Sequence, residues 1–206
     1  MTAREARDHD ACRREVRDLV AAIEPLDDLE RTHRERVLAW IDRGEPLHRT
    51  AKPATPPTHL VSYALVVDRA HREVLLIDHR LAGRWLPTGG HVEPGEHPAD
   101  AAHREVLEEL AVTAALAAGV PAPLLVTAAV AVNVGETEGH TDMSLWFVFD
   151  LDRATPVTVD ATEASASRWW PIDSITHRDG SRFERHLPRA LAKLAASTPA
   201  PDPANR

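Results

Sequence analysis

The sequence predicts an α/β fold in which a mixed sheet is covered on both sides and is preceded by an N-terminal helical extension. Three observations support this prediction. Residues 4–44 repeat apolar side chains at helical spacing, residues 59–173 alternate strand-like runs with one helix in the middle, and residues 181–196 read as a closing helix. A chain of 206 residues has room for one domain with a sizeable core and an appendage.

The N-terminal extension, residues 1–50, is expected to contain two helices. Apolar residues recur at helical spacing on both sides of Pro25, and Gly44 ends the second series. The following residues, 51–58, read AKPATPPT and predict a proline-rich linker. We therefore expect a folded domain at 59–196 and a disordered tail at 197–206, where the composition is mostly proline, alanine and polar residues.

Strands of the predicted domain are recognised by runs of β-branched and aromatic residues between turn signals. The expected strands are 59–68, 72–80, a short one within 85–94, 123–134, 142–152 and 167–173, and a short helix begins at Asp173. The uncharged run 110–135 is long enough to cross a membrane, but Gly119, Pro121 and Pro123 interrupt it. A loop that leads into a buried strand explains this run better.

A helix that begins at Pro98 carries the most informative pattern in the chain. Glu105, Glu108 and Glu109 have i, i+3, i+4 spacing, which places three carboxylates on one face. An acidic helix face is often merely solvated. The alternative is a site for Mg²⁺ or Mn²⁺, since hard divalent cations prefer carboxylate oxygens.

The surrounding residues resemble a known signature. Gly90, five residues, Glu96, seven residues and then REVLEELAV (104–112) resemble the Nudix box, and only Ala111 departs from it, where the family usually has glycine. The resemblance implies a Nudix α/β/α sandwich with a mixed sheet over 59–196.

The same resemblance implies roles for individual residues. It makes Glu105 and Glu109 the firmest metal ligands, Glu108 a ligand directly or through water, and the backbone carbonyl of Gly89 a further ligand. Three other residues, Gly90, Glu96 and Arg104, are then structural, with Arg104 orienting a box glutamate rather than binding substrate phosphate.

The general base remains open at this point. The family takes it from a box glutamate, Glu108 or Glu109, or from a later loop, where Glu163 has a matching distance to Trp169 but is equally consistent with a plain acidic loop. Further candidates are Glu136 and Glu138 on the loop before 142–152, and Asp142 at the end of that loop. The 12 histidines lack the spacing of zinc motifs, so we expect most to be solvated, although His140 could overhang the site.

The resemblance implies a metal-dependent pyrophosphohydrolase that cleaves a nucleoside diphosphate linked to another moiety by water attack on phosphorus. The alternative is a non-catalytic nucleotide-binding or regulatory module on a Nudix fold, although such a module would be expected to lose box carboxylates. Signatures of substrate subgroups are absent, so a nucleotide-type small molecule is expected and its identity stays open.

The composition limits which binding partners and which cellular compartment are expected for this protein. The net charge is −8 with basic residues scattered, which argues against general nucleic-acid binding. Cys12 is the single cysteine, which fits a reducing compartment. The charged start of the chain lacks the apolar segment of a secretion signal, so we expect a cytoplasmic protein without a membrane anchor, and the N-terminal helices could support a homodimer.

Overall fold

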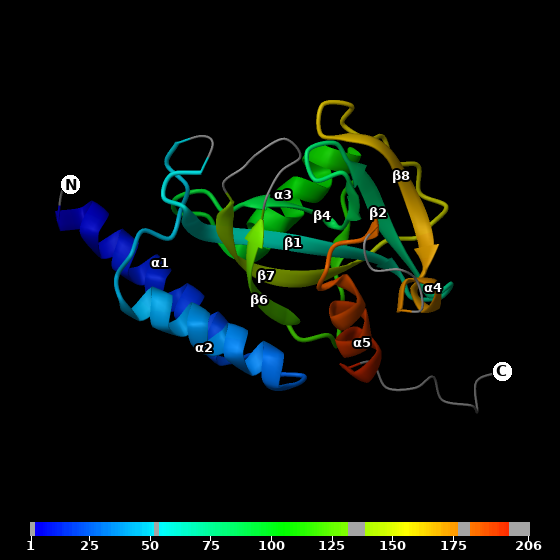
Figure 1. Cartoon of the computed structure of the whole chain (residues 1–206). Coiled ribbons are helices and arrows are strands. Elements are labelled where there is room, and N and C mark those ends of the chain that lie inside the picture. Colours follow the sequence, from blue (N-terminus) through cyan, green and yellow to red (C-terminus); the bar gives the residue numbers. More distant parts are fainter. Residues whose placement is uncertain (1–2, 52–53, 132–138, 177–181, 198–206) are drawn as a thin grey trace.

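The computed structural model describes residues 3–51, 54–131, 139–176 and 182–197 (Figure 1). Its elements follow the chain as α1 (Ala3–Ala21), α2 (Asp28–Asp42), β1 (Thr58–Asp68), β2 (Glu73–His79), β3 (Arg84–Leu86), β4 (Thr88–His91), α3 (Pro98–Leu110), β5 (Ala115–Leu116), β6 (Leu125–Ala131), β7 (His140–Asp150), β8 (Ala164–Pro171), α4 (Ile172–Thr176) and α5 (Leu187–Ser197).

These strands form one mixed sheet around β1 and β7. The central order is β3-β2-β1-β7-β5, while β4 pairs with β1, β6 with β7 and β8 with β2. The long β1–β7 pairing is parallel and the other pairings are antiparallel. The predicted α/β fold with a mixed sheet and preceding helices is therefore confirmed.

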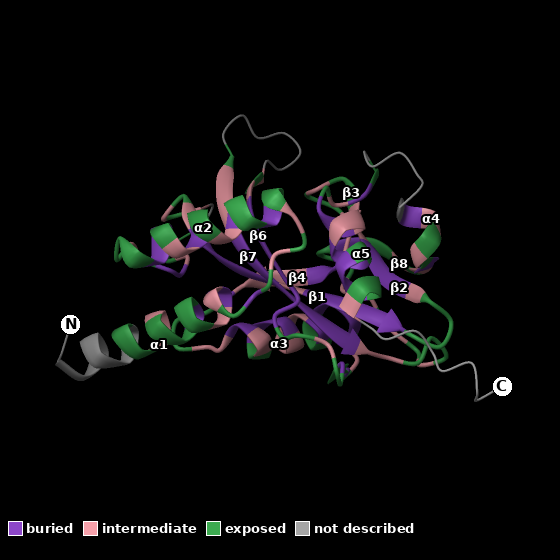
Figure 2. Cartoon of the chain, turned by 90° about the horizontal axis from the view of Figure 1, so that it is seen from below, coloured by how far each residue is buried: buried purple, intermediate pink, exposed green. Residues whose placement is uncertain are grey.

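Helices cover both faces of the sheet. Along β1, Ala64 and Val66 face one apolar cluster and Leu65 and Val67 face the other, as the pleat of a strand requires. The first cluster includes residues of α1, α2 and α3, and the second includes residues of α4 and α5. Figure 2 shows the buried sheet between helices whose outer faces are exposed.

The N-terminal helices are attached to the domain by charge as well as by apolar packing. Lys193 of α5 donates to the carboxylate of Glu30 of α2 over 2.5 Å, and both side chains are nearly inaccessible, 9% and 1% exposed. Arg189 of α5 also pairs with Asp27, which caps α2 by accepting from the Glu30 N–H. Breaking a buried pair leaves one charge without compensation, so these contacts hold α2 against α5.

The expected closing helix at 181–196 is wrong at its start, because α5 begins at Leu187. Pro188 explains the difference, since proline lacks an N–H and its ring clashes with the preceding turn, so it fits only the first turn. Before the helix, Phe183 instead forms a bridge with Trp85. The two-residue strand β5 was also not predicted, because it is too short to show a pattern.

Other expectations fall partly outside the described residues. The linker 51–58 includes 52 and 53, which are not described, and its last residue, Thr58, already belongs to β1. The predicted tail lies, beyond Ser197, outside the described residues. Among the residues that the structure describes, no helix is long and apolar enough to cross a membrane, and the uncharged run instead contributes β5 and β6 to the sheet.

Candidate active site

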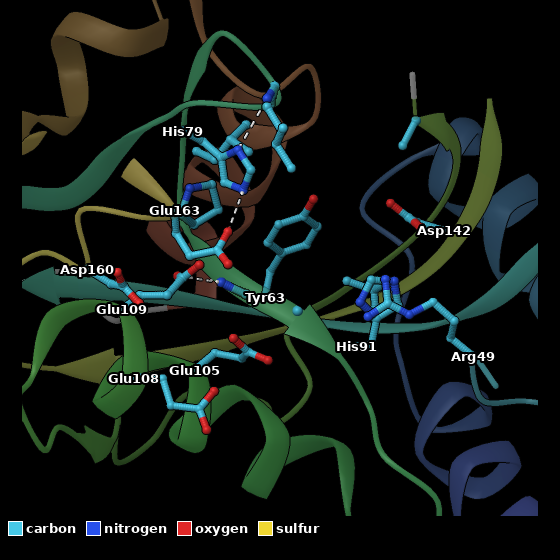
Figure 3. Close-up of a pocket in the computed structure, with 18 of the residues that line it drawn as sticks. Arg49, Tyr63, His79, His91, Glu105, Glu108, Glu109, Asp142, Asp160 and Glu163 are labelled. Atoms are coloured by element: carbon cyan, nitrogen blue, oxygen red, sulfur yellow. Dashed lines mark hydrogen bonds and ion pairs between the residues drawn. The ribbon is translucent and has the colours of Figure 1, made fainter. Parts of the chain in front are cut away.

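A pocket of about 790 Å³ opens between α3, the edge formed by β1 and β4, and the loop before β8. Figure 3 shows its two ends on either side of Tyr63. Glu105, Glu108 and Glu109 lie toward one end, and His91 lies at the other. The pocket is therefore acidic at the helix end and rich in imidazole at the opposite end.

Glu109 is the most buried of the three glutamates on α3, with 5% of its surface exposed. One of its oxygens accepts a hydrogen bond from the Gly89 N–H over 3.2 Å. Burial, followed by the negative charge of Glu105, raises the pKa of Glu109 to about 8. Burial also raises the pKa of Glu105, against the opposing effect of Arg104, whereas the side chain of Glu108 is exposed.

Two glycines allow strand β4 to approach its neighbours closely. A Cβ atom at Gly90 would lie 2.3 Å from Oε1 of Glu105, and one at Gly89 would lie 2.5 Å from the carbonyl oxygen of Ser62. Both distances are shorter than any tolerable contact, so only glycine fits the space as it stands. The carboxylate of Glu105 thus packs directly against the backbone of β4.

Arg104 organises the acidic end without projecting into the cavity. Its guanidinium forms two hydrogen bonds to Glu96, at 2.9 and 3.1 Å, and one to the carbonyl oxygen of His91 at 3.0 Å. It also donates to Glu105 at 2.7 Å and to Glu108 at 3.0 Å. Burial raises the pKa of Glu96, but the bonds from Arg104 and the Glu93 N–H outweigh it and the net pKa is lowered. The structure thus places the ion pair of Arg104 and Glu96 beside the glutamates of the predicted box.

Glu163 reaches the same pocket from the loop before β8. One of its oxygens lies 3.9 Å from Nε2 of His79. Burial lowers the pKa of His79, and the negative charge of Glu163 opposes part of that shift. The loop is tied to α3 because the Asp160 N–H donates to the carbonyl oxygen of Glu109 over 2.9 Å. Figure 3 shows Glu163 on the Glu109 side of Tyr63, so the structure places a fourth carboxylate near the three on α3.

The other candidates are placed differently. Glu136 and Glu138 lie outside the described residues. Asp142 lies at the imidazole end of the pocket, across Tyr63 from the α3 glutamates (Figure 3). His140 also lines the pocket, with its Nε2 3.3 Å from Oδ1 of Asp142. The expectation that most histidines are solvated is wrong: His33, His48, His59 and His186 are buried, and among the histidines whose side chains the structure describes only His71 is exposed. Burial lowers the pKa of His59.

Several pocket residues were missed in the sequence analysis. Arg49 comes from the N-terminal extension, His79 from the end of β2, and Tyr63 from the middle of β1. His91 follows Gly90 directly, and burial lowers its pKa to about 4. The sequence places His91 beside the predicted cleft, next to the Nudix-box glycine, but predicts a solvated side chain, whereas the residue is half-buried in the pocket wall.

Ala111, the one departure from the box, adopts the left-handed conformation that glycine favours. Its φ and ψ are 52° and 37°, and its N–H donates to the carbonyl oxygen of Leu107, closing the end of α3. An alanine in this region costs about 1 to 2 kcal/mol in strain. The helix end therefore keeps the usual capping geometry at the expense of some stability.

Fold and site together define a mixed α/β protein with a carboxylate cluster on a helix that follows a glycine-rich strand. Comparison with known families matches the NUDIX domain over residues 57–191. The chain belongs to the Nudix hydrolase family.

Solved structures of similar fold support this assignment. A MutT protein from Methanosarcina mazei Go1 is 20% identical, with 70% of this chain and 97% of that chain covered and a TM-score of 0.52. A NUDIX-family hydrolase from Clostridium perfringens is 19% identical over 68% and 98%, with a TM-score of 0.51. An Ap4A hydrolase from C. elegans, in a binary complex, is 22% identical over 66% and 95%, also with a TM-score of 0.51. Comparison with curated proteins finds no match.

Proposed function

We propose that the protein is a metal-dependent pyrophosphohydrolase, which cleaves a nucleoside diphosphate linked to another moiety by water attack on phosphorus. The observation that carries the proposal is the buried carboxylate of Glu109 beside Glu105 in an open pocket. Two neighbouring carboxylates in a poorly solvated site are costly unless a cation compensates their charge. Family membership makes hydrolysis of a phosphoric anhydride the reaction to test first.

The residues present fit a hard divalent cation. The donors are oxygens from Glu105, Glu108 and Glu109, and the carbonyl of Gly89 is the further ligand that the family resemblance implies. Mg²⁺ or Mn²⁺ bound there would neutralise negative charge on the phosphate oxygens of the substrate. Arg104 keeps two of these carboxylates in place through its hydrogen bonds, so its contribution is to orient ligands.

Glu163 is the general base that we favour, with Glu108 and Glu109 as the alternatives. It lines the pocket from a loop that is separate from α3, so it can take a proton from the attacking water while the helix carboxylates hold the cation. His79, 3.9 Å from the Glu163 carboxylate, is placed to share that proton. A base must be within hydrogen-bond reach of the water, and Glu163 lies close enough to Glu109 for its charge to affect the pKa of that residue.

The substrate is expected to place the phosphates that react toward the glutamates and to extend past Tyr63, with a further phosphate oxygen toward Arg49. Arg49 is a pocket cation outside α3, and a guanidinium pairs well with phosphate oxygens. Neighbours below 25% identity share the fold alone, so we leave the second moiety open. Dinucleoside polyphosphates, nucleotide sugars and nucleoside triphosphates form the panel for testing.

The test is a hydrolysis screen of this panel with Mg²⁺ or Mn²⁺, followed by product analysis in heavy-oxygen water. Incorporation of the label into one phosphate product is expected, because water attacks phosphorus. Glu163→Gln should lower turnover about a hundredfold without changing cation affinity, whereas Asp100→Asn, a matched acidic control on α3, should leave both unchanged. Tight nucleotide binding without cleavage of any panel member would instead favour a non-catalytic binding module.

A further inference from the structure

A second group of possible ligands lies at the imidazole end of the pocket. It consists of His59 on β1 and of His140 and Asp142 on β7. The parallel pairing of these strands places His59 directly beside Asp142. His140 and Asp142 are two residues apart on one strand and therefore point to the same face of the sheet. Figure 3 shows Asp142 across Tyr63 from the α3 glutamates, so this group is separate from the Nudix-box carboxylates.

The distances within the group are those of ligands around one ion. One ligand atom from each of the three side chains lies within 4.8 Å of the others. Oδ1 of Asp142 is 3.5 Å from Nε2 of His59 and 3.3 Å from Nε2 of His140. Ligands bound at about 2.1 Å in a tetrahedral site lie about 3.4 Å from one another. Little movement is needed to place a cation between them.

The protonation of His59 is set by a backbone contact. Its Nδ1 lies 2.9 Å from the carbonyl oxygen of Pro56, which can only accept, so Nδ1 carries the proton. The lone pair of Nε2 then points toward the group. A histidine that donates its second ring N–H to a backbone carbonyl is the usual arrangement of a metal ligand.

Asp142 provides a second observation that favours a cation at this group. Its Oδ1 is buried and accepts no hydrogen bond from any described residue. A buried carboxylate oxygen without a donor or a cation is costly. His91 is close as well, with its Nε2 3.0 Å from Nε2 of His59, and it donates there because the His59 nitrogen carries the lone pair. A cation at the group would replace this hydrogen bond, and His91 would remain beside the site rather than among its three ligands.

We propose that His59, His140 and Asp142 form a second cation site, which takes a divalent transition metal such as Zn²⁺. Two imidazoles and one carboxylate suit a borderline cation, whereas Mg²⁺ prefers oxygen ligands alone. His140 and Asp142 line the pocket, so one coordination position faces the cavity in which the substrate is expected. The site uses none of the α3 glutamates, and it stands or falls independently of the proposed hydrolysis.

The test is calorimetric titration of the full chain with Zn²⁺, in excess Mg²⁺ to occupy the glutamate site. Wild type should bind one Zn²⁺ at the group, and His140→Ala and Asp142→Asn should each weaken that binding at least about tenfold. His71→Ala is the matched control, since the side chain of His71 is 53% exposed and does not line the pocket, and it should bind Zn²⁺ like wild type. Glu105→Gln should also leave Zn²⁺ binding unchanged.

Cobalt provides a second readout that does not depend on activity. Co²⁺ added to wild type should give the visible absorption of a nitrogen-ligated site, and His140→Ala should lose it. His59→Ala is avoided because this fully buried side chain contributes to folding, and melting curves verify that the two working variants are folded. Zn²⁺ binding that disappears in Glu105→Gln but survives in His140→Ala would overturn the proposal. Absence of binding at micromolar Zn²⁺ would overturn it too, and the group would then be a hydrogen-bonded network.

Discussion

Replacing Glu109 by glutamine should stabilise the cation-free protein at alkaline pH and remove most of its activity. Burial and then the charge of Glu105 raise the pKa of Glu109 from 4.5 to about 8. A carboxyl whose pKa is higher in the folded than in the unfolded chain stabilises the fold while it is protonated. This contribution is fully present below about pH 4.5, declines as the pH rises, and is lost above about pH 8.

The size of the effect follows from the two pKa values. At about 1.4 kcal/mol for each pKa unit, the ionised side chain costs the folded state up to about 5 kcal/mol at alkaline pH. Relaxation of the site and entry of water reduce this cost. We therefore expect Glu109→Gln to exceed wild type in free energy of unfolding by about 2 to 4 kcal/mol near pH 9, and by less than about 1 kcal/mol near pH 5. The glutamine carbonyl can still accept from the Gly89 N–H, so the substitution removes mainly the charge.

The assay is urea unfolding of both proteins in EDTA at the two pH values, together with turnover in Mg²⁺. Titrating groups that do not contribute to the pKa of Glu109, such as Glu184, are common to both proteins and cancel in the difference. Turnover of the variant should fall at least about a hundredfold, as expected when a metal ligand is lost. A stability difference that does not change with pH, or a variant that is less stable than wild type near pH 9, would refute the reasoning. Near-normal turnover would remove Glu109 from the site.

Three further predictions concern the same region. Mg²⁺ or Mn²⁺ at a hundred times its Kd should stabilise the protein by about 2.7 kcal/mol, seen as a higher melting temperature that EDTA reverses; a melting curve indifferent to both contradicts the cation site. Gly90→Ala should weaken Mg²⁺ binding at least about tenfold with little loss of stability, because the new Cβ displaces the end of the Glu105 side chain. Thermal-shift titration with Mg²⁺ measures the affinity, and an unchanged Kd would contradict this prediction. Ala111→Gly should raise the free energy of unfolding by about 0.5 to 1 kcal/mol in urea, since φ is 52°, and an unchanged or lower value would contradict strain at this position.

The parts of the site that could be predicted are those that lie close together in sequence. Glu105, Glu108 and Glu109 share one helical turn, so their common face follows from helix geometry alone. The imidazole end could not be predicted in this way. His59 and Asp142 meet only because β1 and β7 pair in parallel over a long register, and sequence spacing carries no information about that pairing.

The burial of individual side chains was the second property that could not be predicted from the sequence. His59 reads as a polar residue at the start of a strand, yet it is fully buried, with the rings of His91 on β4 and His140 on β7 lying against it. Arg49 follows the helical extension, and only the path of the chain into β1 brings it to the pocket. The start of α5 was within reach of the sequence, since Pro188 already argued against a helix from 181.

The ion pair between Glu30 and Lys193 has a consequence for how this chain is divided. The NUDIX match begins after Glu30 and ends just before Lys193, so both partners lie outside it. A fragment cut to the matched residues would lose α2 and uncover Val126 and Ala128 of β6, which belong to the same apolar cluster as α2. Trimming only one end would strand a charge in the interior. The segment that identifies the family is thus shorter than the segment whose contacts stabilise the fold. Helices α2 and α5, from opposite ends of the chain, stabilise each other through this ion pair.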